Sequence, residues 1–509
     1  MEGEAALNGF YQYQPNREGL KKAVIDKSKA NLDRNLLVQV LRNQYAGMDL
    51  NEKVTYNIEK LLQPDTFTIC AAHQPNVLTG HLYFIYKILH VIKIADELNE
   101  SSDAAYFVPV YYMGSEDADL NELGRVFINE VCYQWKTDQQ GAVGRMKIDD
   151  AFLNFLNEIR PEIVKEPEGE SIMSLLFSCY QPGKTIQEAT LDLVNQLFGK
   201  FGLLILVPDN SLLKNTFKNI MEEELKSQSS YQILQNTLVS FPGKYAAPAK
   251  GRAINLFYLK GNIRERIEKN DGRFKIVNTD IEFSEDEILK ELHQYPERFS
   301  PNVILRPLFQ EMLLPNVVFV GGGAEIGYWM ELKNIFESYS IPYPLLLLRN
   351  SFAIIEKRVA KNIKDLKIEP IELFQENHLI IDKMIEMQKI QGISLASQKQ
   401  ELVQVYQKIE DFAKASDLTL EKHVAALKSK ALKRIEQLEK KILRAERRKF
   451  QKELLSIIDI KSDLFPNDTL QERVDNFCFY AARYGLGFID SLYSSSKTFD
   501  QHFCILVED

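Results

Sequence analysis

A histidine-containing loop follows an apolar segment near the N-terminus and is the first place where the residue types suggest chemistry. The apolar residues 66–72 are followed by His73, Gln74, Asn76, Thr79 and Gly80, and a helical pattern begins at Leu82. Free amides at a helix start favour an anion, and an imidazole beside them can stabilise a phosphate or a developing oxyanion. We therefore predict that His73 is catalytic and that the other four residues of the loop bind substrate. The alternative is a histidine that only closes a loop.

An acidic loop follows the second apolar segment, residues 104–113. It contains Glu116, Asp117 and Asp119. Carboxylates grouped in this way can bind Mg²⁺, orient an amine or a ribose hydroxyl, or act as a general base, so we predict a catalytic role for all three. The competing interpretation is a helix N-terminus with acidic residues, which is common.

A third group of polar residues and glycines occurs between residues 306 and 349. The glycines permit a ligand to approach the backbone, and arginine can pair with phosphate or carboxylate. The pattern is neither a GxGxxG after the first strand nor a P-loop. The alternative is a tight strand–helix turn. The predicted substrate-binding residues are Arg306, Gln310, Gly321, Gly322, Gly323, Glu325, Tyr328, Trp329 and Arg349.

The elements that must position these residues are five short apolar segments separated by helices or long insertions. They lie at 66–72, 104–113, 203–210, 317–329 and 343–351, and the fourth passes through three glycines into a helix. This order predicts an α/β fold, with a Rossmann-like, mostly parallel sheet whose carboxyl ends collect the polar residues. The expected core is 1–124, 201–224 and 301–351, interrupted by inserts at 125–200 and 225–300.

The C-terminal third has a different pattern. Apolar residues at heptad-like spacing within 402–412 and 424–445 predict an antiparallel helical hairpin inside a helical coiled-coil domain, residues 352–458, with Ser416 and Asp417 as caps. Residues 422–452 contain 12 Lys and Arg against 3 Glu, a net charge of +9. A solvated coiled-coil face is the simplest explanation, and a nucleic-acid arm or phosphate-binding wall is secondary. Residues 459–509 are expected to pack on the core.

Composition excludes several classes of protein. The 509 residues have a formal net charge of -9, which argues against a protein built to hold nucleic acid. The N-terminus has no signal-peptide pattern, and no apolar run is long enough for a membrane span, so we expect a cytoplasmic protein. Five cysteines without a CxxC pair are typical of reduced thiols, and we expect no tightly bound metal.

Four long motifs in one order resemble a known family. HQPNVLTGHLYFIYK, PVYYMGSEDADLNEL, RPLFQEMLLPNVVFVGGGAEIGYWMELK and LFPNDTLQERVDN are similar to the bacillithiol biosynthesis cysteine-adding enzymes, the BshC family, over essentially the whole chain. The resemblance implies a Rossmann-like core with two connecting-peptide inserts and a coiled-coil domain that supports a homodimer. It implies a cytoplasmic ligase joining L-cysteine to glucosaminyl-malate in the last step of bacillithiol synthesis. It also implies an ADP-type nucleotide site near the coiled coil, separate from the main cleft. ATP or an ADP-type nucleotide, with Mg²⁺, is the expected cofactor.

The loop after the first strand departs from the family pattern, because Thr79-Gly80-His81 stands where Thr-Gly-Pro is expected, with His81 in place of the proline. His73 and His81 are also too far apart for a class I His-x-Gly-His signature, so we assign the chemistry to His73. We expect the cysteine carboxyl to be activated as an acyl-adenylate or acyl-phosphate, Asp117 or Asp119 to orient the amine, and Arg306 and Arg349 to hold the malate carboxylates. The alternatives are a related ligase with another amine acceptor, or a non-enzymatic scaffold that binds RNA or a partner.

Overall fold

The computed structural model describes residues 5–101, 104–245, 248–387 and 395–508. It divides the chain into two compact units. The first unit comprises Met1–Phe352 and Glu472–Cys504, and the second comprises Ala353–Gln471 and Ile505–Asp509. The segment expected to form a C-terminal tail is therefore divided between the two units.

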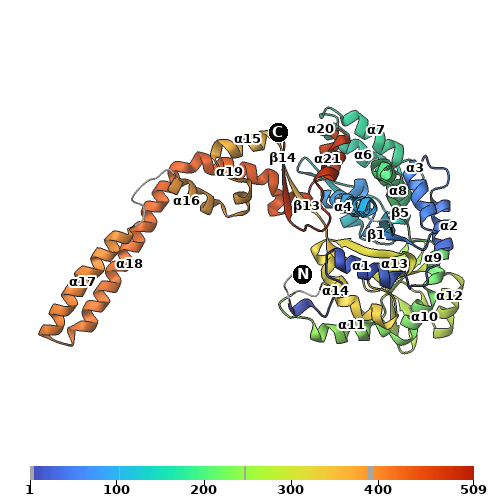
Figure 1. The fold of residues 1–509 in the computed structure, drawn as a ribbon, viewed down its shortest axis with the longest axis horizontal. Coiled ribbons are helices and arrows are strands. Elements are labelled where there is room, and N and C mark those ends of the chain that lie inside the picture. Colours follow the sequence, from blue (N-terminus) through green and yellow to red (C-terminus); the bar gives the residue numbers. More distant parts are fainter. Residues whose placement is uncertain (1–4, 102–103, 246–247, 388–394, 509) are drawn as a thin grey trace. The chain divides into compact units, whose positions relative to one another are not determined.

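A five-stranded parallel sheet forms the centre of the first unit (Figure 1). Its strand order is β12-β11-β1-β2-β5, with every neighbouring pair parallel. The strands are β1 (Thr66–His73), β2 (Tyr106–Met113), β5 (Leu204–Leu206), β11 (Asn316–Gly321) and β12 (Leu345–Leu348). All five coincide with predicted strands, so the predicted Rossmann-like sheet is confirmed. The order reverses at β1, and ligands bind at such switch points in open α/β sheets.

Helices cover both faces of this sheet, because its strands are apolar on both sides. On one face, Val318 and Val320 of β11 join a core that includes Leu20 of α1 (Arg17–Lys27) and Val91 of α4 (Leu82–Ser101). On the other face, Phe319 stacks on Trp329 of α14 (Gly323–Ser338), with ring centroids 4.2 Å apart. Successive residues of β11 thus face opposite helical layers, as the two-residue period of a strand requires.

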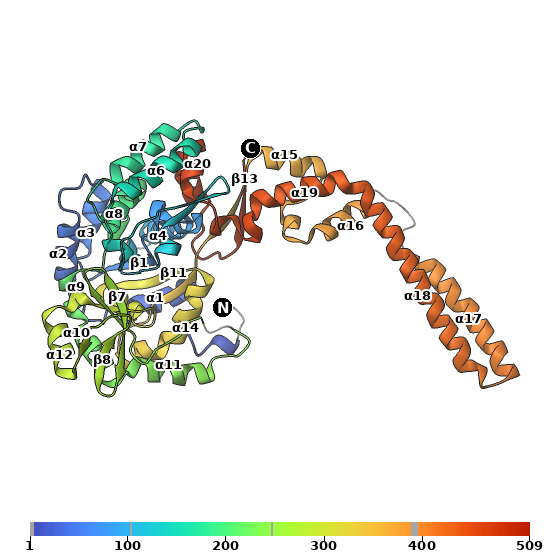
Figure 2. The same ribbon diagram turned by 180° about the vertical axis from the view of Figure 1, so that it is seen from behind.

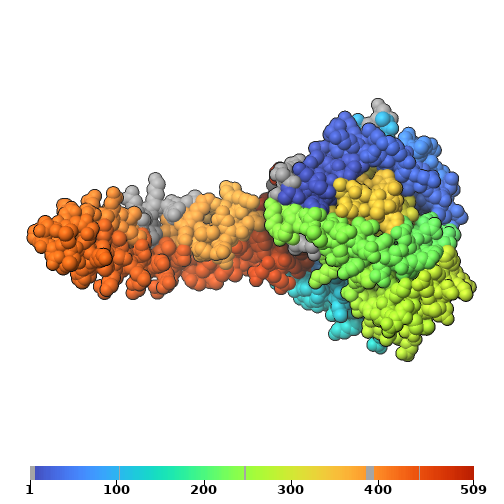
Figure 3. Space-filling view, turned by 90° about the horizontal axis from the view of Figure 1, so that it is seen from below, coloured from blue at the N-terminus to red at the C-terminus, as the bar shows by residue number. Residues whose placement is uncertain are grey.

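Two insertions extend the first unit. The first contains β3 (Arg125–Ile128), β4 (Val131–Gln134), α6 (Asp150–Ile163), α7 (Gly169–Cys179) and α8 (Ile186–Phe198). The second contains α11 (Ser229–Ser240), β6 (Leu256–Lys260), β7 (Ile263–Asn270), β8 (Arg273–Ile276), β9 (Glu282–Phe283), α12 (Glu285–Gln294) and β10 (Phe299–Pro301). Its strands form an antiparallel sheet in the order β10-β6-β7-β8-β9, which Figure 2 shows beside α10 (Lys218–Ser227) and α12. In the space-filling view its green and yellow-green atoms form one continuous surface (Figure 3).

The other elements of the first unit are shorter or lie at the sheet edges. They are α2 (Arg34–Gln44), α3 (Glu52–Lys60), α5 (Leu120–Leu123), α9 (Ser211–Thr216), α10 (Lys218–Ser227), α13 (Arg306–Leu313), α20 (Phe477–Tyr484) and α21 (Gly487–Ser495). Strands β13 (Ser351–Ile355) and β14 (Phe503–Val507) pair with each other, and the boundary between the units falls within both.

The second unit is helical. Its helices are α15 (Lys357–Leu366), α16 (Asn377–Met387), α17 (Ala396–Ser416), α18 (Leu420–Arg447) and α19 (Gln451–Leu464). Helices α17 and α18 lie side by side, so the predicted antiparallel hairpin is confirmed. At the turn, Asp417 accepts hydrogen bonds from the amide and the hydroxyl of Thr419. Ser416 instead donates to the carbonyl of Phe412, so the prediction that it caps the helix is wrong.

A buried carboxyl in α14 makes the stability of the first unit depend on pH. The Glu331 side chain is buried, and a contact with the backbone amide of Ala249 only partly offsets its loss of water. Burial raises the pKa of Glu331 from 4.5 to about 7. The folded state therefore prefers the protonated carboxyl, so this contribution to stability is complete below pH 4.5 and is lost as the pH rises through about 7.

We expect Glu331→Gln to raise the free energy of unfolding at pH 8 by about 2 kcal/mol and to have little effect near pH 4.5. Urea unfolding at several pH values measures this difference. Glu337→Gln is the matched control, because Glu337 lies on the same helix and its side chain is 59% exposed. If the free energy of unfolding changed with pH in the same way for the wild type and Glu331→Gln, the raised pKa could not belong to Glu331.

Candidate active site

A cavity of about 460 Å³ lies at the carboxyl ends of the central strands, where the strand order reverses. The ends of β1 and β2, the segment after β5, helices α13 and α14 and the second insert all contribute to its wall. Seven predicted site residues line it together: His73, Gln74, Glu116, Asp117, Arg306, Glu325 and Tyr328. Segments far apart in sequence thus converge on one site, as the sequence analysis expected.

His73 is the last residue of β1, and neither nitrogen of its ring has a hydrogen-bond partner among the described residues. The Tyr111 hydroxyl donates to the carbonyls of His73 and Gln74, and the Gly114 amide donates to the His73 carbonyl, so the turn after β1 is fixed. The imidazole packs near Tyr83 and Phe84. Burial lowers the pKa of His73 well below 6.5, so the ring is neutral at pH 7 and offers one donor and one acceptor.

The loop after β2 places two carboxylates in the cavity wall in different environments. Asp117 accepts hydrogen bonds from the Ala118 amide at 2.7 Å and from the Gln74 side-chain amide at 3.3 Å. Glu116 is buried against Lys214, whose ammonium lies 2.6 and 2.8 Å from its two oxygens. Ser300 also donates to Glu116. Glu116 is therefore held by its own cation, whereas Asp117 is the carboxylate better placed to meet an amine.

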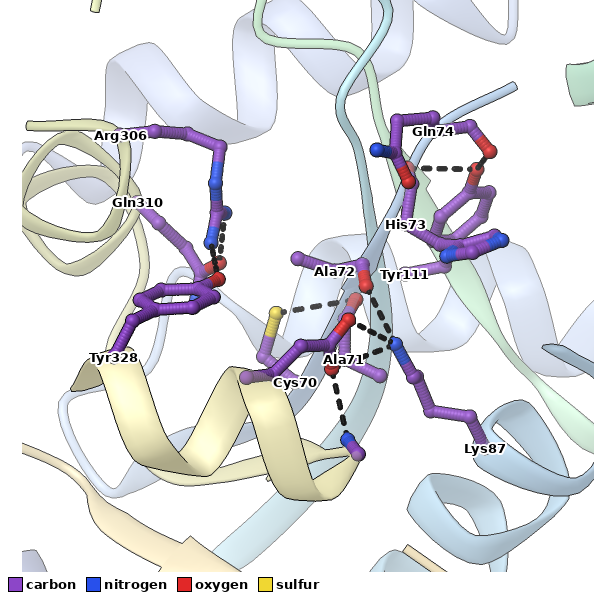
Figure 4. A network of polar contacts seen from close by, with 12 residues as sticks. Cys70, Ala71, Ala72, His73, Gln74, Lys87, Tyr111, Arg306, Gln310 and Tyr328 are labelled. Carbon is purple, nitrogen blue, oxygen red and sulfur yellow. Dashed lines mark hydrogen bonds and ion pairs between the residues drawn. The ribbon is translucent and has the colours of Figure 1, made fainter. Parts of the chain in front are cut away.

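Helix α13 supplies the guanidinium of Arg306, and α14 supplies Glu325, which forms an ion pair with Lys87 of α4 (Figure 4). Arg306 donates to Gln310 at 3.0 Å and to the Tyr328 hydroxyl at 2.9 Å. Lys87 is fully buried and donates to the Ala72 carbonyl and to both oxygens of Glu325. One Glu325 oxygen also accepts from the Gly322 amide, which ties the start of α14 to β1.

The second insert contributes cavity residues that the sequence analysis did not predict. They are Lys250, Arg252, Phe257, Arg264 and Ser300–Val303. Arg264 stands out, because its guanidinium carbon lies 3.9 Å from the centre of the Phe257 ring. The small β elements of this insert were recognised from sequence, but no motif showed that they cover the carboxyl ends of another sheet.

Ten of the predicted site residues are not among those lining the cavity: Asn76, Thr79, Gly80, Asp119, Gln310, Gly321, Gly322, Gly323, Trp329 and Arg349. Asp119 caps α5 through the Glu122 amide, and Trp329 is fully buried between aromatic rings. Gln310 supports Arg306 from behind. Arg349 forms a buried bidentate pair with Glu472, so its guanidinium is engaged away from the cavity.

The loop from Asn76 to Gly80 is strained and buried. Leu78, Thr79 and Gly80 all have positive φ, and Gly80 has φ 70° and ψ -134°. Asn476 secures the loop by donating to the carbonyls of Leu78 and Gly80. His81, the departure from the family pattern, contacts the Val474 carbonyl through Nδ1 at 3.0 Å. In this structure His81 therefore joins the loop to the segment before α20.

We expect Gly80→Ala to lower the free energy of unfolding by about 1–3 kcal/mol, because a Cβ at this φ would meet the Asn76 Cβ at 2.8 Å. Gly183→Ala is the control, since Gly183 also has positive φ but has no neighbouring atom within 4 Å of the position that a Cβ would take. Urea unfolding should show the larger loss for Gly80→Ala. Equal losses of unfolding free energy in the two variants would mean that the loop can move to accommodate the Cβ, which would contradict the prediction.

The groups in the cavity fit an anion better than a resident metal. Among the described residues, no group of three or more His, Cys, Asp and Glu side chains could hold a metal ion. Glu116 is already paired with Lys214, so Glu116 and Asp117 do not form a ready Mg²⁺ site. In contrast, the buried Arg264 Nε and both His73 ring nitrogens lack partners among the described residues, and such groups suit the phosphate of a nucleotide or a carboxylate.

Comparisons with known proteins agree with this architecture. The family model for the BshC N-terminal Rossmann-like domain of bacillithiol biosynthesis matches residues 1–350, and the model for the BshC C-terminal coiled-coil domain matches 352–508. The chain belongs to the BshC family. A relative from Flavobacterium psychrophilum is 37% identical over 94% of this chain and 90% of its own. One from Flavobacterium johnsoniae is 34% identical over 99% and 96%, and both are named "Putative cysteine ligase BshC".

The BshC assignment confirms the expected fold class and coiled-coil domain and places the chain in a family of ligases. A solved structure titled "putative arginyl t-RNA synthetase" from Campylobacter jejuni covers 91% of this chain and 98% of its own, with 11% identity and a TM-score of 0.26, too weak a likeness to carry an argument. Within the described ranges, every helix is too short or too polar to cross a bilayer.

Proposed function

We propose that this BshC chain joins the carboxyl carbon of L-cysteine to the amine of glucosaminyl-malate and so completes bacillithiol. The observation that carries the proposal is the convergence of His73, Asp117 and Arg306 on one cavity at the sheet's switch point, in a chain of the BshC family. The names of the relatives support a cysteine ligase. The cavity volume of about 460 Å³ is within the usual range for small-molecule sites.

Each cavity residue has a role that its environment supports. Arg306 binds a carboxylate of the acceptor, because its guanidinium is already oriented by Gln310 and Tyr328. Asp117 accepts a proton from the acceptor amine and directs the nitrogen lone pair at the cysteine carboxyl carbon. His73, as a neutral imidazole, donates a hydrogen bond to the oxygen that gains charge when the nitrogen attacks.

A carboxylate does not react with an amine until its oxygen becomes a leaving group. A nucleoside triphosphate would supply that activation when bound, and Lys250 and Arg252 of the cavity lining are cations suited to its phosphates. In the bond-forming step the nitrogen bonds to the carboxyl carbon, the leaving group departs with its electron pair, and the nitrogen loses one proton to Asp117. The nucleotide and Mg²⁺ requirement is part of the proposal.

The test is to incubate the purified chain with L-cysteine, glucosaminyl-malate, ATP and Mg²⁺ and to measure bacillithiol by mass spectrometry. Product that depends on the chain and on all substrates supports the proposal. Omitting ATP or Mg²⁺ in turn shows which is required. Absence of product in the complete mixture, with a chain that melts cooperatively, would contradict it. A panel of other amine acceptors then tests the alternative of a related ligase.

We also propose that the hairpin of α17 and α18 mediates a homodimer. The supporting observation is a set of apolar side chains that stay more than 40% exposed in the isolated chain: Val405, Ile409, Phe412, Leu418, Leu420, Leu427 and Leu438. Light scattering on the full chain should give twice the 58.7 kDa mass. A Phe412→Asp, Leu438→Asp variant should be monomeric, and an unchanged mass would contradict a dimer through this hairpin.

A further inference from the structure

Arg264 reaches the cavity from the second insert. It is the second residue of β7, which pairs with β6 in the antiparallel sheet. Its guanidinium lies over the Phe257 ring, 3.9 Å from the guanidinium carbon to the ring centre, and both residues line the cavity. Stacking on an aromatic face fixes the plane of a guanidinium while leaving its edge free to bind a ligand.

No carboxylate of the described residues neutralises Arg264 directly. Its Nε is buried without a partner, and burial lowers the pKa of Arg264, with only partial compensation from Asp117, Glu116 and Glu265. Glu116 is already engaged by Lys214 and Ser300. Arg264 is half-buried, and a cation that lies partly out of water without a direct counter-ion is destabilising, so an anionic ligand would stabilise it.

Arg306 provides a second guanidinium in the same wall, held by Gln310 and Tyr328 and 5.5 Å from the centre of the Tyr112 ring. The described residues that line the cavity include four cations: Lys250, Arg252, Arg264 and Arg306. The lining acids are Glu116, Asp117 and Glu325, of which Glu116 and Glu325 are paired with Lys214 and Lys87. Among these lining residues, Asp117 is the one acid without a lysine partner, and it faces a total of four cations. The cavity therefore favours a ligand with more than one negative charge.

We propose that Arg264 and Arg306 bind the two carboxylates of the malate half of the acceptor, so that the second insert selects a dicarboxylate substrate. This inference rests on the proposed function and refines it by naming the residue that sets specificity. Arg264 takes the place that the sequence analysis gave to Arg349, whose guanidinium is committed to Glu472. A sugar amine without the malate group would leave Arg264 unpaired in the cavity wall, which is how a polar site disfavours a smaller analogue.

Binding of free malate tests the pair without relying on catalysis. Isothermal titration of the full chain with L-malate, and with L-lactate as a monocarboxylate, measures the preference for two carboxylates. We expect the wild type to bind L-malate more tightly than L-lactate and Arg264→Met to weaken L-malate binding by about 10–100-fold. Arg266→Met is the matched control, since Arg266 is two residues along β7 and pairs with Glu268, and it should bind as the wild type does.

Kinetics then separate this inference from the proposed function. Arg264→Met should raise the KM for glucosaminyl-malate and should reduce the ratio of kcat/KM for glucosaminyl-malate to kcat/KM for methyl glucosaminide, which lacks malate. Malate binding that depends on Arg264 in a chain that makes no bacillithiol would support the arginine pair and reject the proposed function. Product formation with malate binding unchanged in Arg264→Met, or no L-malate binding by the wild type, would overturn the pair. If Arg264→Met fails to melt cooperatively, Arg264→Lys, which keeps the charge without the planar fork, should show an intermediate loss, and wild-type affinity would overturn the proposal.

Discussion

His73→Ala should lower the rate of bacillithiol formation by about 100–1000-fold, the usual loss when a donor to a developing oxyanion is removed. The expectation follows from the proposed function and from two observations: His73 lines the cavity, and its ring nitrogens have no protein partner among the described residues. His73→Gln, which restores an N–H donor, should recover part of the rate. Steady-state kinetics with a mass-spectrometric readout measures both variants.

The pH dependence of the same variants reports the charge of His73. Because burial lowers the pKa of His73 well below 6.5, the imidazole stays neutral throughout the neutral range. The ratio of wild-type to His73→Gln rate should therefore be constant between about pH 6 and 8, even if protonation of the acceptor amine changes both rates. A ratio that changes steeply near pH 6.5 would show that His73 titrates in this range and is not held neutral, and wild-type activity in His73→Ala would remove it from the site.

Glu472→Ala should lower the free energy of unfolding by about 3–5 kcal/mol, because it leaves a buried guanidinium without its counter-ion. The side chains of Arg349 and Glu472 are 4% and 1% exposed, with contacts of 2.7 and 3.0 Å between them. Denaturant unfolding measures the loss. Asp490→Ala is the control, since its pair with Lys200 is about half exposed and should be worth less than about 1 kcal/mol.

A double variant tests whether this pair is only structural. Arg349→Met with Glu472→Leu removes both charges and should recover much of the stability lost in Glu472→Ala. Its KM for glucosaminyl-malate should equal that of the wild type, because Arg349 is not among the residues lining the cavity. A large increase in KM would instead support the sequence-based assignment of Arg349 to substrate binding.

The sequence was most informative where periodicity is strong. The five core strands are short apolar runs bounded by polar loops, and the hairpin has a regular apolar spacing, so both could be predicted. The strand ends also identified His73 and Asp117, because carboxyl ends of parallel strands meet at one edge, whereas Arg306 was identified from the polar motif at the start of α13. What periodicity cannot show is the partner of a polar group. Like Arg306, Arg349 is an isolated arginine close to the glycine motif, and nothing near it in the sequence shows that it pairs with Glu472, more than a hundred residues later.

For a related reason, the sequence could not show that residues of the second insert line the cavity. Arg264 lies in an ordinary amphipathic strand, and its importance depends on how β6 and β7 are placed over another sheet. Trp329, in contrast, was predicted to bind substrate but does not line the cavity. It belongs to a helix that begins at the site, but its ring points into the core against Phe319 and Phe336, away from any ligand.

The strand order has a consequence for how the protein is made. One edge of β1 is covered by β2, which follows soon after it, but the other edge pairs with β11, which begins at Asn316, 243 residues after His73 (316 minus 73). While the ribosome synthesises the intervening chain, β1 has an open edge of unpaired backbone N–H and C=O groups, which can pair with other nascent chains. We therefore expect chaperones that bind the nascent chain until β11 has emerged to favour efficient production in a host cell.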